Sequence, residues 1–108
     1  MPEITLEQFQ QVELRVGTII NAEAHPNADR LLVLQVDVGG QTRQFVAGIK
    51  GPYQAAELVG KQLVVVPNLK PATLRGVESQ GMVLAAQDGT ALALLTLDRP
   101  IQAGSLVK

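Results

Sequence analysis

The stretch from Val12 to Ala24 restricts the possible folds most strongly. Apolar and polar residues alternate along it, which is the pattern of a half-buried β-strand. The residues that we expect on its inner face are Val12, Leu14, Val16, Ile20 and Ala22. At thirteen residues it is long for a strand, and Gly17 near its middle predicts a bend or bulge. A long bent strand can serve two sheet segments, as a small closed barrel requires.

The rest of the chain predicts short strands and two short helices. Stretches rich in aliphatic and β-branched residues predict further strands over 31–38, 41–48, 62–68, 81–87 and 91–96. Gly39-Gly40 is a hairpin turn. A helix over 4–12 has Thr5 as its N-cap and Gln8 at the spacing of a capping box. A second helix, over 52–60, ends at Gly60.

This order of elements predicts an all-β protein with one domain over residues 1–108. We expect a five-stranded Greek-key barrel of the OB-fold type, with short helices and a C-terminal β arm. Side chains fill so small a barrel, so ligands bind on its outer face and its loops. The segment from Asn68 to Met82 is such a loop, because it is polar and lies between two apolar strands.

Composition excludes several functions. The net charge of −1 argues against a non-specific nucleic-acid binder, although a local basic patch remains possible. Three aromatic residues, Phe9, Phe45 and Tyr53, are too few for a platform that stacks single-stranded bases. The chain has no cysteine, and His25 is its only histidine. We therefore expect no metal site, no cofactor and no catalytic triad; the protein is not an enzyme, and His25 is a loop residue before Pro26.

The apolar runs are too short to span a bilayer, and the N-terminus lacks an apolar signal core. We therefore expect a soluble, cytoplasmic protein with no membrane partner.

Several motifs together resemble the tRNA-binding OB-fold domain family, which includes free-standing dimeric tRNA-binding proteins and the C-terminal domain of many methionyl-tRNA synthetases. The motifs are Leu14-Arg15-Val16-Gly17, His25-Pro26-Asn27-Ala28-Asp29-Arg30-Leu31, Val36-Asp37-Val38-Gly39-Gly40, Asn68-Leu69-Lys70-Pro71 and Leu74-Arg75-Gly76-Val77-Glu78-Ser79-Gln80-Gly81-Met82. The last two together are specific, and the resemblance covers nearly the whole chain.

The resemblance implies recognition of tRNA by shape, at the outer corner of its L. It also implies a homodimer joined by the N-terminal helix and the C-terminal arm, and an aminoacyl-tRNA synthetase as a possible partner. The contact residues that it implies are Asn27, Arg30, Lys70, Arg75, Ser79 and Met82. This chain departs from the pattern in its slightly acidic charge, with Gln35 and Gln80 where relatives often carry Lys or Glu.

Side-chain chemistry extends this set of contacts. Arg30, Arg43, Lys70 and Arg75 are long cations that can reach phosphates. Asn27, Ser79 and Gln80 can hydrogen-bond ribose hydroxyls and base edges. Met82 can pack under an exposed base.

Structural roles are the alternative for several of these residues. Asn27 and Asp29 can simply form the turn, and Ser79 can cap its own loop. Lys70 and Arg75 can be a solvated loop edge, and Met82 can belong to the core. We expect Arg15 to pair with Glu13, Glu78 or another carboxylate rather than with RNA.

A chaperone-like or protein-binding dimer is the alternative function. Leu31, Val33 and the C-terminal arm would then carry the binding, which would depend little on salt. Our candidates for burial between two copies are the stretch 91–95 and the tail residues Ile101, Leu106 and Val107. The alternative is that these residues cap the end of their own barrel.

Overall fold

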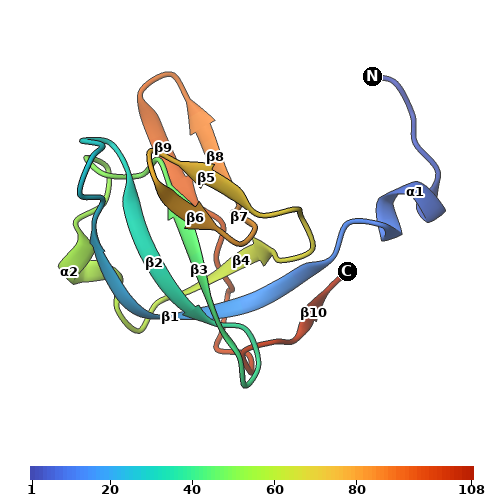
Figure 1. The fold of residues 1–108 in the computed structure, drawn as a ribbon. Coiled ribbons are helices and arrows are strands. Elements are labelled where there is room, and N and C mark those ends of the chain that lie inside the picture. Colours follow the sequence, from blue (N-terminus) through green and yellow to red (C-terminus); the bar gives the residue numbers. More distant parts are fainter.

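A computed structural model describes all 108 residues. Its main sheet is antiparallel, with strand order β3-β2-β1-β4-β7, and it curls into a nearly closed barrel (Figure 1). The strands are β1 (Leu14–Ala24), β2 (Leu32–Asp37), β3 (Thr42–Ala47), β4 (Gln62–Val66) and β7 (Met82–Val83). The predicted five-stranded OB-fold barrel is confirmed.

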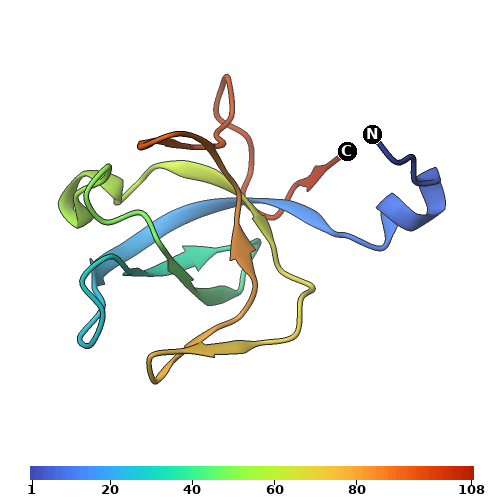
Figure 2. The same ribbon diagram turned by 90° about the horizontal axis from the view of Figure 1, so that it is seen from above.

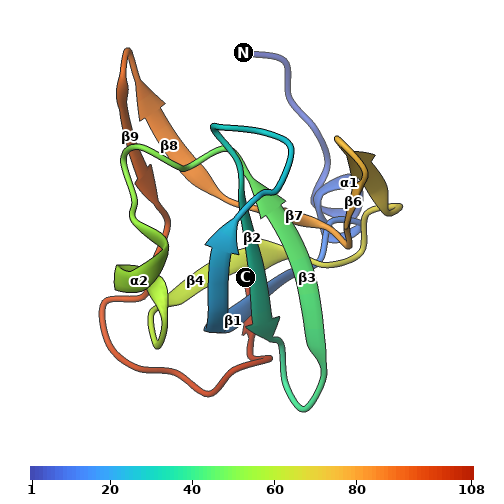
Figure 3. The ribbon, with the colours of Figure 1, turned by 60° about the vertical axis from the view of Figure 1, so that its left-hand side comes forward.

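Two helices, two hairpins and a short terminal strand complete the chain. The helices are α1 (Leu6–Gln10) and α2 (Ala55–Leu58), and neither is long and apolar enough to cross a membrane. The first hairpin joins β5 (Ala72–Leu74) to β6 (Val77–Ser79), and the second joins β8 (Ala85–Asp88) to β9 (Ala91–Leu94). The two hairpins leave the barrel on different sides (Figures 2 and 3). Strand β10 (Leu106–Val107) pairs with the start of β1.

Strand β1 does serve two sheet segments, but its irregularity lies beyond Gly17. Residues 15–18 pair with β4 and residues 18–24 pair with β2. The register shifts between Ile19 and Asn21, so Ile19 is fully buried while Ile20 is 50% exposed. The bend or bulge predicted at Gly17 is instead a register shift between Ile19 and Asn21, and the predicted inward face of Ile20 was wrong. Gly17 allows close packing instead, because a Cβ atom there would lie 2.5 Å from Cγ1 of Val36.

The segment 68–82 is not the simple loop that we expected. Its residues 72–79 form the β5–β6 hairpin, which lies against β3. The hydroxyl of Ser79 accepts a hydrogen bond from the Val46 amide, and Val46 is the partner of Val33 in the sheet. Val33 is consequently only 4% exposed, not open to a protein partner as the alternative function required. The strand expected over 81–87 also divides at Leu84 into β7 and β8.

The core lies inside the barrel. Leu32, Leu34 and Val36 of β2 face inward as predicted, around the fully buried ring of Phe45. Leu58 of α2 is also fully buried in this core. The capping box at Thr5 and Gln8 is confirmed, but α1 buries none of its residues.

The barrel closes where the segment Ser79-Gln80-Gly81 meets the free edge of β3. The Gln80 amide donates to the Gln44 carbonyl (2.7 Å), and the Gln44 amide donates to Oε1 of Gln80 (2.9 Å). Gly81 then turns the chain into β7 with φ of 134°. A Cβ atom at Gly81 would lie 2.3 Å from the Val66 carbonyl oxygen and 2.8 Å from the Phe45 ring.

Replacing Gly81 with alanine should therefore destabilise the barrel strongly. Since the methyl group would clash with backbone and core, we expect a loss of about 3 kcal/mol or more in the free energy of unfolding. Denaturant titration measures this loss. Gly89→Ala is the matched control, because Gly89 also has positive φ (60°) but nothing lies within 4 Å. We expect it to cost about 1–2 kcal/mol; equal losses in the two variants would contradict the clash.

Candidate nucleic-acid interface

The first loop, residues 25–31, is hydrogen-bonded to the β5–β6 hairpin through His25. Nε2 of His25 lies 2.8 Å from the Leu74 carbonyl oxygen, and Nδ1 lies 2.9 Å from the Asn27 amide nitrogen. His25 is only 5% exposed. The two loops that the OB-fold uses for ligands therefore meet in one surface, although we expected His25 to be no more than a loop residue.

Three cations surround this junction. Arg30 belongs to the first loop, and its carbonyl accepts a hydrogen bond from the Lys50 amide at 3.3 Å. Arg75 directly follows Leu74, at the tip of the hairpin. All three side chains are exposed, and none takes part in either of the two ion pairs of the chain. Lys50 was missed in the sequence because it belongs to none of the motifs; only its contact with Arg30 reveals it.

The tip of the hairpin is a tight turn at Arg75-Gly76. Arg75 has φ of 52° and Gly76 has φ of 88°, and Arg75 is the only non-glycine residue with positive φ. Two successive residues with positive φ are typical of a type I′ hairpin turn, whose twist matches that of the strands. An arginine at the first position costs some backbone free energy, and it places a cation at the tip.

Two more cations lie toward the other end of the hairpin. Nη1 of Arg43 donates to the Pro67 carbonyl oxygen at 3.0 Å, which ties β3 to the connection between β4 and β5. In that connection Asn68 accepts from the Glu13 amide and donates to the Gln11 carbonyl oxygen. Lys70 follows and is exposed. Because β5 is extended, Lys70 and Arg75 are roughly 16 Å apart along the chain.

Ser79 and Gln80 are engaged within the protein. Ser79 is 3% exposed, and its hydroxyl accepts from the Val46 amide and donates to the Gly81 carbonyl oxygen. Oε1 of Gln80 accepts from the Gln44 amide, and the Gln44 side chain donates to the Glu78 carbonyl oxygen. Ser79 therefore holds the hairpin on β3 through a buried hydroxyl, whereas the Nε2 group of Gln80 makes no hydrogen bond.

The other predicted residues are accessible. Asn27 is exposed, with its backbone fixed by His25. Met82 is 47% exposed at the start of β7 rather than in the core. Arg15 is bound to Glu13 at 2.7 Å and to the Gly104 carbonyl oxygen at 3.1 Å, which confirms the expected partner for this residue.

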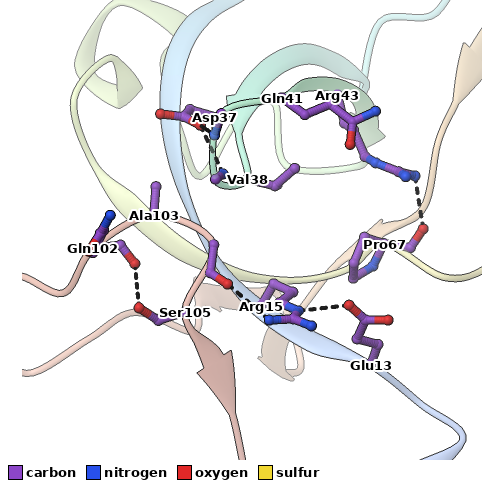
Figure 4. Close-up of a pocket in the computed structure, with 13 residues that line it drawn as sticks. Glu13, Arg15, Asp37, Val38, Gln41, Arg43, Pro67, Gln102, Ala103 and Ser105 are labelled. Carbon is purple, nitrogen blue, oxygen red and sulfur yellow. Dashed lines mark hydrogen bonds and ion pairs between the residues drawn. The ribbon is translucent and has the colours of Figure 1, made fainter.

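A polar hollow of about 720 Å³ opens between the start of β1, the β2–β3 turn and residues 102–105. Figure 4 shows Arg15 and Arg43 on its wall, the first joined to Glu13 and the second to Pro67. Asp37 also lines it, and its carboxylate accepts from the Gly39 and Gly40 amides. Glu13 and Asp37 offset the charge of the two arginines, and Glu13 is already paired with Arg15, so this hollow has little net attraction for an anion.

The chain belongs to the family described as "Putative tRNA binding domain", whose model matches residues 14–106. It is similar to the methionine–tRNA ligases of Pyrococcus furiosus (47% identical over 108 residues) and Thermotoga maritima (52% over 104 residues). It covers 15% and 16% of those two proteins, respectively, so it corresponds to a small part of each.

Solved structures agree with this assignment. A protein of Pyrococcus horikoshii described as MetRS related has a TM-score of 0.92 and 32% identity, with full coverage of both chains. The chaperone CsaA of Bacillus anthracis has a TM-score of 0.90 and 28% identity, covering 99% of this chain and 100% of its own.

Replacing Ser79 with alanine tests its structural role. The buried Val46 amide would lose its acceptor, so we expect the free energy of unfolding to fall by about 1–3 kcal/mol, measured by denaturant titration. Ser105→Ala is the control, because that hydroxyl also donates to a backbone carbonyl but is exposed; it should cost no more than about 0.5 kcal/mol. A Ser79→Ala variant as stable as this control would contradict the assignment.

Proposed function

We propose that this protein binds folded tRNA at its outer corner, on the surface formed by the first loop, the β5–β6 hairpin and the β4–β5 connection. The observation that carries the proposal is the hydrogen bond from His25 to Leu74, because it joins two loops far apart in the sequence into one surface. Membership of the tRNA-binding family supports the choice of ligand.

The charge distribution supports this surface despite the net charge of −1. Five of the nine Lys and Arg residues lie on this surface or next to it. Arg30, Lys70 and Arg75 belong to the three segments that form it, whereas Arg43 is bonded to Pro67 of the β4–β5 connection and Lys50 to Arg30 of the first loop. Neither ion pair of the chain involves them, so they remain free to neutralise phosphates. Duplex RNA is recognised mainly by shape and backbone contacts, which suits cations spread along a hairpin.

Each accessible residue has a distinct role in the proposal. Arg30, Lys50 and Arg75 bind phosphates beside the first loop, and Lys70 and Arg43 do so at the base of the hairpin. Asn27 and the free Nε2 group of Gln80 hydrogen-bond ribose hydroxyls or unpaired bases. Met82 packs against an exposed base. Ser79 supports the hairpin from below and makes no contact with RNA.

A homodimer is the second part of the proposal. The helix α1 stands clear of the barrel on the side where the chain ends (Figures 1 and 2). Its apolar residues Leu6 and Phe9 are 70% and 41% exposed, Val12 beyond it is 42% exposed, and Leu106 of β10 is 54% exposed. Apolar side chains gathered at one end favour burial against a second copy, and two linked RNA sites would raise the affinity without new contacts.

We further propose that the protein acts by binding and not by catalysis. It would do so in the cytoplasm, in support of an aminoacyl-tRNA synthetase. The chain matches only a small part of the methionine–tRNA ligases, and it is similar over its whole length to a MetRS related protein. A chaperone-like activity is the alternative, favoured by the similarity to CsaA. The burial of Val33 removes one of the side chains on which that alternative relied.

Removing two cations should weaken tRNA binding and reduce its dependence on salt. In a gel-shift titration over several salt concentrations, Lys70→Ala/Arg75→Ala should bind at least about tenfold more weakly at low salt. The slope of log K against log salt should fall by about two, because about one counterion is released per phosphate contact.

Lys61→Ala/Arg99→Ala is the matched control. It removes the same charge at the other end of the β1–β2 ladder from the first loop, which follows Ala24. Arg99 lies beside Thr18, and the Lys61 carbonyl accepts from the Ile19 amide. The proposal fails if both double variants weaken binding equally. Binding that does not change with salt would favour the chaperone-like alternative.

Phe9→Asp should separate the dimer, because an aspartate would place a charge within the proposed apolar contact. Sedimentation equilibrium at micromolar concentration should give a dimer for the unmodified protein and a monomer for this variant. Val59→Asp is the control: Val59 is also exposed (53%), but it follows α2, far from α1. A stable monomer before substitution would rule out the homodimer.

A further inference from the structure

We infer that His25 is a positioning residue for RNA: its neutral imidazole holds the first loop and the tip of the β5–β6 hairpin in register, without touching the RNA. This inference rests on the proposed function. It begins from the residue itself, which is 5% exposed and has both ring nitrogens in hydrogen bonds.

The two contacts identify the tautomer. The Asn27 amide can only donate, so Nδ1 must accept and carries no proton. The Leu74 carbonyl can only accept, so Nε2 must carry the proton and donate. The geometry therefore requires the neutral ring with its proton on Nε2.

Each contact positions one of the proposed RNA-binding segments. The bond to the Asn27 amide orders the first loop, which is also closed by the bond from the His25 amide to the Leu31 carbonyl oxygen. The bond to Leu74 fixes the residue before the Arg75-Gly76 turn. It is the only hydrogen bond between the first loop and the hairpin, so it is the direct polar link between the segments that carry Arg30 and Arg75.

Protonation of the ring would break this arrangement. A proton on Nδ1 would turn the acceptor into a donor that faces the Asn27 amide. The charged residues on the segments that meet here are Glu23, Asp29, Arg30, Lys50, Arg75 and Glu78, and none of them hydrogen-bonds to the ring. The chain has no other histidine, so no second imidazole contributes to a pH effect on binding.

The direction of the pH effect distinguishes positioning from contact. If His25 positions the loops, acidification weakens tRNA binding, since the bond to Asn27 is lost and the two N–H donors of the ring and the Asn27 amide then repel each other. If His25 contacts a phosphate, acidification strengthens binding, since the imidazolium attracts the anion. The experiment is therefore tRNA affinity measured at about pH 7 and about pH 5.5 at constant salt.

Each of two substitutions retains one of the two hydrogen bonds of the His25 ring. The amide of His25→Gln can still donate to the Leu74 carbonyl oxygen, whereas His25→Asn can accept from Asn27 but cannot reach Leu74. We expect His25→Asn to bind tRNA about tenfold more weakly at neutral pH, and His25→Gln to remain within about threefold of the original affinity. In either variant, lowering the pH should not reduce the affinity for tRNA.

Thr96→Val is the matched control, because it also removes a side-chain hydrogen bond to a backbone carbonyl, here that of Gln62, away from the proposed RNA surface. It should leave both the affinity and its pH dependence unchanged. Stronger binding by the unmodified protein at low pH would overturn the inference, and so would a His25→Asn variant with the original affinity.

A second measurement separates this inference from the proposed function. Nitrogen NMR of the free protein should show His25 with its proton on Nε2. Protection of the Asn27 amide, which is its exchange rate compared with the intrinsic rate at the same pH, should fall in His25→Gln and on acidification. If tRNA does not bind at either pH, the proposed function fails, and the inferred role in RNA binding fails with it. The positioning of the loop is then tested by NMR alone, and a ring with its proton on Nδ1 would refute it.

Discussion

Closure of the barrel along β3 is the contact on which the rest of the structure depends. An edge strand exposes unpaired backbone groups, and proteins cover them or pair them. Here the segment Ser79-Gln80-Gly81 supplies a backbone amide, a side-chain amide oxygen and a hydroxyl to β3. The same contacts hold the β5–β6 hairpin against the barrel. The hydrogen bonds that close the core therefore also place the proposed RNA surface.

The unpaired cations of the proposed RNA surface explain how a slightly acidic chain can offer a site for RNA. Two of the acidic residues, Glu13 and Asp98, pair with cations outside the proposed surface. The five cations of that surface form no ion pairs, so a phosphate would not have to displace a carboxylate from them. Exposed charges act over only about 8–10 Å at physiological salt. The local arrangement therefore matters more for RNA binding than the net charge of −1.

Much of the fold was predictable because local patterns determine local structure. The capping box at Thr5, the Gly39-Gly40 turn and the inward residues of β2 all followed from short-range chemistry. The errors arose where distant contacts decide. The register of β1 shifts at Ile20 because one strand must pair with both β2 and β4. Val33 is buried because a hairpin from much later in the chain lies against β3 beside it.

The sequence by itself determined the class of barrel, the family and most of the charged residues that the proposed site requires, since these depend on residue type and order. Only the tertiary structure decided that Ser79 is buried and bonded to Val46, that Lys50 lies beside Arg30, and that His25 joins the two loops. The physical reason is that a hydrogen bond depends on the distance and direction between groups. For residues 49 positions apart, such as His25 and Leu74, folding alone determines both.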